Sequence, residues 1–138
     1  MTDPDLVAKK LAFIETCIRE LEVLARPELI ETDIRERRFI EHTLQVAIQA
    51  ALDVASHIVS DERLGEPRTN RELFGELSRA GWLERPLASA LEAAAGFRNL
   101  VVHGYGEVDL LVLRDVTENR LGDLSGFVES IRKRLPRC

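Results

Sequence analysis

The chain has 138 residues, of which 45% are hydrophobic, 31% charged and 5% aromatic, and its formal net charge is −5. This composition excludes a disordered, collagen-like or small disulfide-stabilised chain, and the length predicts a single domain over residues 1–138. Uninterrupted apolar runs reach only four residues, as at 110–113, far below the roughly 20 that a membrane span needs. We see no secretory signal and expect a cytoplasmic protein without a membrane partner. The acidic balance argues against non-specific coating of nucleic acid, so we expect no DNA partner and only local contacts with RNA.

The apolar periodicity predicts helices in chain order. Residues 5–25 carry one apolar stripe at helical spacing, and Arg26-Pro27 ends it because proline disfavours the helical conformation of the residue before it. A second helix begins at Asp33, where Glu36 completes a capping-box pattern. Its apolar face is so broad that we expect two neighbours, one of which could belong to another subunit.

The second half of the chain continues this pattern after a loop at residues 61–70. A short helix starts at the capping box formed by Thr69 and Glu72 and ends at Gly81. The next helix runs from Arg85-Pro86 to about Val102, and residues 108–135 carry a final helical stripe. The sequence therefore predicts an all-α, antiparallel bundle of four or five helices.

Arg98 breaks the pattern of the helix that contains it. From residue 93 to residue 102 every other position except Asn99 is apolar or glycine, which predicts a segment buried nearly all round. A guanidinium there costs several kcal/mol to desolvate unless it is paired or faces a wet cleft. Asp53, beside the apolar row of the second helix, could be that partner, although a solvated position for this carboxylate is an equal alternative.

Asn99 and His103 follow Arg98 along the same helix. Histidine can exchange a proton near neutral pH, and arginine offers a fixed fork of donors to a phosphate. Together they suit metal-free RNA cleavage, in which a base takes the 2′-hydroxyl proton and cations stabilise the pentavalent phosphorus. Arg98 and His103 lie about 140° apart around an intact helix. They can converge only if the helix ends or bends near His103, or if a second copy of the chain supplies one of them.

A wider pattern surrounds these residues. The segment F-R-N-x-x-V-H-x-Y resembles the signature of HEPN domains, and its H-x-Y ending is similar to that of the HepT toxins, the small partners of minimal nucleotidyltransferases. The resemblance extends to the long first helix, to the segment R-R-F-I-E-H-T-L-Q that opens the second, and to L-x-x-x-G-W-L at residues 77–83.

The resemblance implies a homodimeric, metal-independent endoribonuclease toxin that needs no cofactor. It makes His103 the general acid and base, Arg98 the ligand of the phosphate and transition state, and Asn99 the residue that orients His103 or the ribose. It also implies that a nucleotidyltransferase antitoxin blocks the toxin by attaching AMP to Tyr105. The alternative is a non-catalytic HEPN module that helps a nucleotidyltransferase to hold its nucleotide or substrate.

Other polar residues have simpler interpretations. His42 and His57 lack the spacing of a zinc site, so we expect no metal. The arginines at residues 35, 37 and 38 are typical of a salt-bridged helix start, with an RNA track as the less favoured alternative. The basic segment 131–137 fits either a helix C-terminus or a backbone contact to RNA. Trp82 is expected to plug the end of the bundle.

Overall fold

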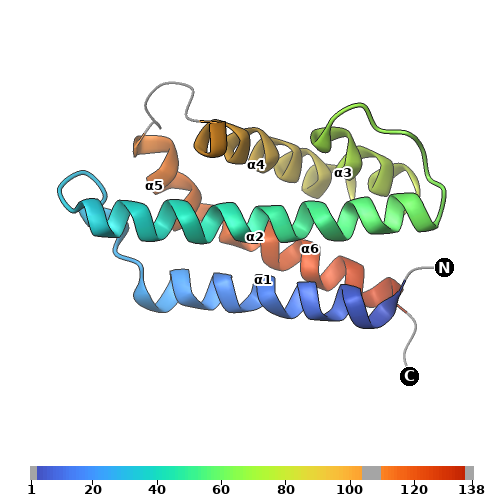
Figure 1. The fold of residues 1–138 in the computed structure, drawn as a ribbon, viewed down its shortest axis with the longest axis horizontal. Coiled ribbons are helices and arrows are strands. Elements are labelled where there is room, and N and C mark those ends of the chain that lie inside the picture. Colours follow the sequence, from blue (N-terminus) through green and yellow to red (C-terminus); the bar gives the residue numbers. More distant parts are fainter. Residues whose placement is uncertain (1–2, 104–109, 136–138) are drawn as a thin grey trace.

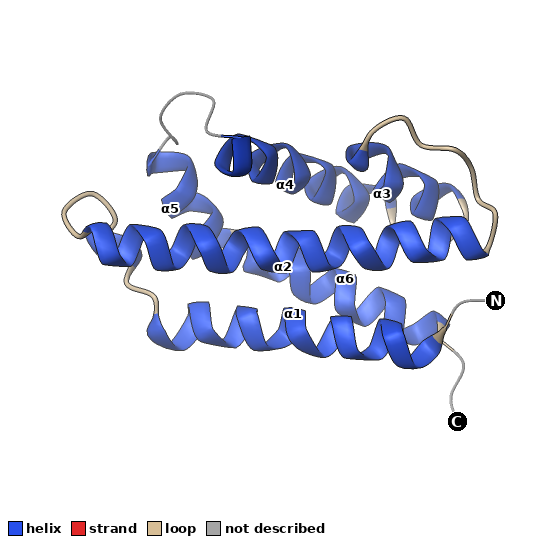
Figure 2. Ribbon diagram, in the orientation of Figure 1, coloured by secondary structure: helices blue, strands red, loops and turns tan. Residues whose placement is uncertain are grey.

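The computed structural model describes residues 3–103 and 110–135, except for the side chains of residues 70–71 and 99–103. These residues form six α-helices and one short 3-10 helix (Figures 1 and 2). The elements are α1 (Pro4–Leu24), η1 (Pro27–Leu29), α2 (Ile34–Asp61), α3 (Asn70–Arg79), α4 (Arg85–His103), α5 (Leu110–Asn119) and α6 (Leu121–Arg134). The predicted all-α class is confirmed, whereas the predicted number of four or five helices was too low.

The long helix α2 is the centre of the bundle. It packs against α1, α3, α4 and α6 of the same chain, with α1 along one side and the α3–α4 pair along the other (Figure 1). Twelve of its residues are buried. Its broad apolar face is therefore covered by neighbours within one chain, and does not by itself call for a second subunit.

The additional helix comes from a break in the C-terminal segment, which the sequence analysis predicts as a single helical segment. Arg120 separates α5 from α6 with φ −115° and ψ 2°. Just before it, the Thr117 hydroxyl donates to the Leu113 carbonyl oxygen at 2.8 Å, a bond that bends helices. Asn119 and Gly122 flank the break and are poor helix formers. As a result α5 packs against η1 and α6, whereas α6 reaches α1 and α4.

Helix boundaries elsewhere follow the local signals, although two capping boxes are incomplete. Asp33 caps α2 through the Arg35 amide, but the Glu36 carboxylate accepts from the Arg26 amide at 2.9 Å instead of from the cap. Thr69 stands at the cap of α3 without a side-chain bond, and the Glu72 carboxylate accepts from the Arg68 amide at 2.6 Å. Each glutamate carboxylate therefore binds a backbone amide that precedes the helix, and not the amide of the cap residue.

The turn from α3 to α4 closes one end of the bundle. Gly81 adopts φ 85°, in the left-handed region that favours glycine, and the chain then buries Trp82. The Arg134 guanidinium lies 4.8 Å from the centre of the Trp82 ring and donates to the Gly81 carbonyl oxygen at 3.0 Å. The expected role of Trp82 as a plug is confirmed.

Candidate functional site

Helix α4 carries the candidate residues. Its inner stripe contains Ala88, Leu91 and Ala95, which are all buried. Arg98 follows Ala95 by three residues and Leu91 by seven, so it continues this stripe. Its side chain is half-buried and its Nε atom is inaccessible to solvent. The sequence therefore located correctly the charge that interrupts the apolar seam.

The helix continues without interruption from Arg98 to His103. Five residues of intact helix separate the two positions by about 140° around the axis and about 7.5 Å along it. The helix ends at His103, and an end near this residue is one of the routes to convergence that the sequence left open. The side chains of Asn99 and His103, and Tyr105 altogether, lie outside the described residues.

The segment around Arg98 is less buried than the sequence predicted. Ala93 is exposed, and Ala90, Ala94 and Gly96 are half-buried. For these residues the prediction of a segment buried nearly all round was wrong, because α2, α3 and α6 cover only part of α4. The uncovered part is one wall of a cleft.

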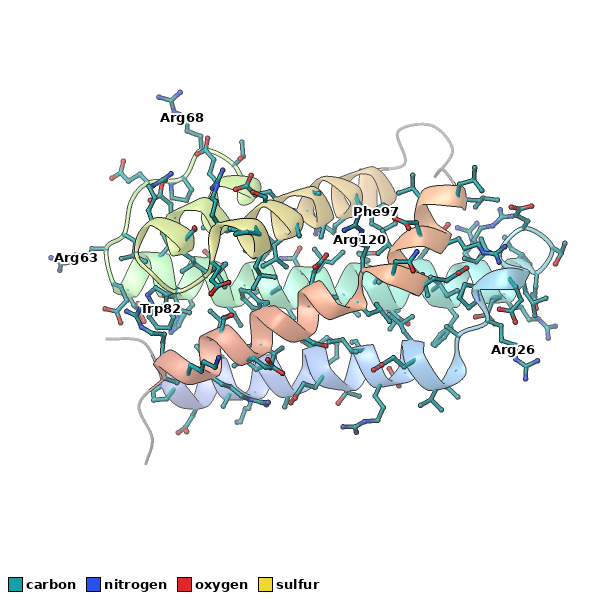
Figure 3. All side chains as sticks on the ribbon, turned by 180° about the vertical axis from the view of Figure 1, so that it is seen from behind. Arg26, Arg63, Arg68, Trp82, Phe97 and Arg120 are labelled. Carbon is teal, nitrogen blue, oxygen red and sulfur yellow. The ribbon has the colours of Figure 1, made fainter. Side chains whose placement is uncertain are left out.

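This cleft, which we call the α4–α6 cleft, has a volume of about 460 Å³. Leu44 and Ile48 of α2 and Leu124 of α6 form its buried floor. Phe97 of α4 and Arg120, between α5 and α6, both line the cleft (Figure 3). The sequence analysis missed this feature, and the only signal was the run of small residues on one face of α4.

Asp53 does not act as the partner that was considered for Arg98. Its two carboxylate oxygens accept from the Lys10 ammonium at 3.2 Å and from the Gln49 amide at 2.8 Å. The side chain is 41% exposed. The alternative of a solvated Asp53 is the one that the structure supports.

The basic segments at the start of α2 and the end of α6 take part in contacts within the chain. Arg37 donates to the Ile30 carbonyl oxygen at 3.3 Å, and Arg38 lies 3.7 Å from Glu41. Arg132 of α6 makes two hydrogen bonds to Glu15 of α1, at 2.6 and 2.8 Å. These contacts favour the structural interpretation of both segments over an RNA track.

Possible metal ligands and the buried thiol of Cys17 complete the side-chain chemistry of the described residues. Among the described residues, no group of three or more histidine, cysteine or acidic side chains is arranged to hold a metal ion. Burial raises the pKa of the Cys17 thiol, and a buried thiol with a raised pKa is a weak nucleophile.

No helix in the described ranges combines the length and the apolar character that crossing a membrane requires.

The all-α bundle, with an inward-facing arginine on α4 and a histidine at the last position of that helix, has the architecture of a HEPN domain. Residues 14–131 match the family described as "Ribonuclease HepT-like", and the chain belongs to this family.

Individual relatives agree with this assignment. The chain is 29% identical over 129 residues to the "mRNA nuclease HepT" of Shewanella oneidensis, covering 93% of this chain and 97% of that one. It is 32% identical over 112 residues to the "tRNA nuclease HepT" of Aphanizomenon flos-aquae, covering 78% and 74% of the two chains. A solved structure of the tri-AMPylated Shewanella oneidensis HEPN toxin in complex with its MNT antitoxin superposes with a TM-score of 0.87 at 28% identity, covering 97% of this chain and all of that one.

Proposed function

We propose that this protein is the ribonuclease toxin of a HEPN–nucleotidyltransferase toxin–antitoxin pair, and that it cleaves RNA as a homodimer without a metal ion. Relatives that cover most of the chain are nucleases, and one of them is complexed with an MNT antitoxin. The observation that carries the proposal is the half-buried Arg98 guanidinium on the motif helix. A permanent cation at that position is suited to binding a phosphodiester.

In the proposed chemistry His103 and Arg98 act on the substrate, and Asn99 orients His103 or the ribose. His103 takes the proton of a ribose 2′-hydroxyl, and the 2′-oxygen attacks the adjacent phosphorus. Arg98 stabilises the charge on the pentavalent centre, and Asn99 orients His103 or the ribose. The bond to the 5′-oxygen then breaks, and the imidazole returns its proton to that oxygen. The products are a 2′,3′-cyclic phosphate and a free 5′-hydroxyl.

The resemblance to HEPN domains supports a composite site built from two subunits. Five helical residues separate Arg98 from His103, the last residue of α4, so the two positions lie about 140° apart around the helix axis. We place Arg98 of one subunit with His103 of the other at a two-fold axis. In this arrangement the active site is complete only in the dimer.

Purified protein and a metal chelator test this activity. We expect RNA degradation to persist in EDTA, and His103→Ala and Arg98→Ala each to lower the rate at least about 100-fold, as removal of a general base or of a transition-state donor does. Arg85→Ala is the matched control, because Arg85 lies on the same helix but is exposed. Loss of cleavage in EDTA, or a His103→Ala variant as active as the parent, would refute the mechanism.

In this proposal the antitoxin attaches AMP to Tyr105, which is the single tyrosine of the sequence. A phosphorylated nucleoside two residues from His103 adds negative charge and bulk where the RNA phosphate has to bind. Co-expression with the nucleotidyltransferase is expected to add the mass of one or more AMP units to the parent and none to Tyr105→Phe. AMP units on the Tyr105→Phe variant would contradict the assignment.

A non-catalytic HEPN module remains the second candidate, favoured by the net charge of −5, which opposes RNA binding. In that case the chain leaves RNA intact but changes the affinity of the transferase for its nucleotide. Equal nucleotide affinity with and without the chain would reject this candidate.

A further inference from the structure

The α4–α6 cleft has polar groups at its edge as well as an apolar floor. Asp115, Arg120 and the half-buried Asp123 line it together with apolar residues of α2, α4 and α5. Its volume of about 460 Å³ lies within the range of roughly 300–1,000 Å³ that small-molecule sites occupy. Apolar walls with a few polar groups at one edge suit a heteroaromatic ring, which buries its faces and forms hydrogen bonds through its rim.

Asp115 and Arg120 form a single hydrogen-bonding edge. The Arg120 Nε atom lies 3.8 Å from one carboxylate oxygen of Asp115, which is too long for a hydrogen bond and does not use up the guanidinium donors. The other oxygen accepts from the Asn119 side-chain amide at 2.8 Å. Asn119 thus orients the carboxylate, and each oxygen keeps a further lone pair for a ligand. The pair can present one donor beside two acceptors.

Guanine is the base that complements this edge. Its Watson–Crick edge carries the O6 acceptor, the N1–H donor and the N2 amino donor in that order, so O6 can accept from Arg120 while the two donors bind Asp115. Adenine, cytosine and uracil do not offer one acceptor beside two donors. Two carboxylates against one guanidinium also disfavour a phosphate in the cleft, which therefore suits a base better than the RNA backbone.

The cleft leads to the proposed phosphate ligand. Ala94 lines the cleft and precedes Arg98 by four residues, so the two residues share one face of α4. Side chains on a helix lean towards its N-terminus, which directs Arg98 back towards Ala94. A phosphate held by Arg98 is then about one helical turn, or about 5.4 Å, from the cleft. A single nucleotide can span that separation between its phosphate and its base.

From this arrangement we infer that the α4–α6 cleft is a base pocket that selects guanosine next to the scissile phosphate. Asp115 and Arg120 bind the Watson–Crick edge of the base, and Asn119 positions the Asp115 carboxylate. The inference rests on the proposed ribonuclease function, because it names the base that the same site prefers. Asp115 and Arg120 determine specificity and take no part in the proton transfers.

Defined oligonucleotides test the choice of base. The probes are uridine oligonucleotides that carry a single guanosine, inosine, adenosine or cytidine. We expect cuts at a phosphodiester next to guanosine, with kcat/KM at least about tenfold above that of the adenosine and cytidine probes. Inosine keeps O6 and N1–H but lacks the N2 amino group, so its probe should be cleaved at an intermediate rate.

Substitutions at the edge test the residues. Asp115→Asn replaces a carboxylate acceptor with an amide donor that opposes the donors of guanine, so the preference for guanosine should disappear while the rate on the adenosine probe stays within about twofold. Arg120→Ala should lower the rate on the guanosine probe in the same selective way. Glu118→Gln is the matched control, because it neutralises an exposed carboxylate of α5 that does not line the cleft. It should keep the parental preference.

The outcomes distinguish this inference from the proposed function. If a protein that degrades total RNA cleaves all four probes equally, prefers another base or cleaves none of them, the base pocket is wrong and the ribonuclease stands. A guanosine preference that survives in Asp115→Asn and Arg120→Ala also overturns the pocket. If either variant separates dimers of the parent in sedimentation velocity, a second copy covers the cleft and the inference fails. If total RNA stays intact, the proposed function fails together with the pocket.

Discussion

The proposed composite site makes a quantitative prediction about mixed dimers. Arg98→Ala and His103→Ala subunits are each expected to be inactive as homodimers. In a mixed dimer the surviving Arg98 and the surviving His103 belong to different subunits, which is the arrangement of the proposed composite site. One of the two intersubunit pairs is therefore complete.

The size of the recovery follows from counting. Random assembly of equal amounts makes about half of the dimers mixed, and each mixed dimer has one complete pair out of two, so the mixture should regain about a quarter of the parental rate. Co-expression of differently tagged subunits, or refolding of the mixture, supplies these dimers. RNA cleavage is then measured at equal total protein concentration.

The complementary mixture distinguishes the two arrangements of the site. When the parent is mixed equally with the double variant Arg98→Ala/His103→Ala, the mixed dimers keep both groups on one subunit. Sites shared between subunits then leave about a quarter of the activity, whereas sites within one chain leave about half. A first mixture without activity and a second that retains half would refute the composite site.

Three further predictions concern the scaffold. Hydrogen bonds from Arg132, and then the charge of that residue, hold the pKa of Glu15 below its ordinary value. Glu15→Gln should therefore lower the free energy of unfolding at neutral pH by about 0.5–1 kcal/mol, or the melting temperature by about 2–4 °C. The difference should vanish as the pH falls through the lowered pKa, and an equal deficit at all pH values would contradict the assignment. Phe127 is fully buried, so Phe127→Ala should cost about 3–5 kcal/mol in urea unfolding, and a loss below about 1 kcal/mol would show that its packing is overestimated. Asp33→Ala should cost about 1 kcal/mol in thermal unfolding and Thr69→Ala less than about 0.5 kcal/mol, because only Asp33 makes a capping bond; equal losses would contradict this reasoning.

The sequence predicted those parts of the fold that depend on local backbone chemistry. Arg26-Pro27, Asp33, Gly81 and Arg85-Pro86 mark helix ends in the structure within one or two residues. A proline or a left-handed glycine restricts the backbone whatever surrounds it. These boundaries can therefore be read from the chain alone.

Features that depend on the choice between tertiary partners were not predictable in this way. Residues 108–135 were predicted as one helical segment, and the division between α5 and α6 appears only when each helix has its own neighbours. In a helical bundle Asp53 could pair with a cation from any of several helices, and in the structure it pairs with Lys10 of α1. The exposed Ala93 shows the same limit, since periodicity identifies a small apolar residue but not what covers it.

The distribution of charge bears on how an acidic protein can act on RNA. Most of the arginines whose contacts can be traced are held in ion pairs with carboxylates of the same chain: Arg38, Arg79, Arg85, Arg114, Arg120 and Arg132. Their positive charge is largely compensated, so they offer little long-range attraction to a phosphate backbone. Affinity for RNA then has to come from a few contacts at the proposed site, and the proposed two-fold axis doubles each of them. A nuclease of this kind should show a shallow dependence of RNA binding on salt and should prefer single-stranded segments that can enter a small groove, because the ion-paired arginines of the described residues offer little charge for holding a duplex.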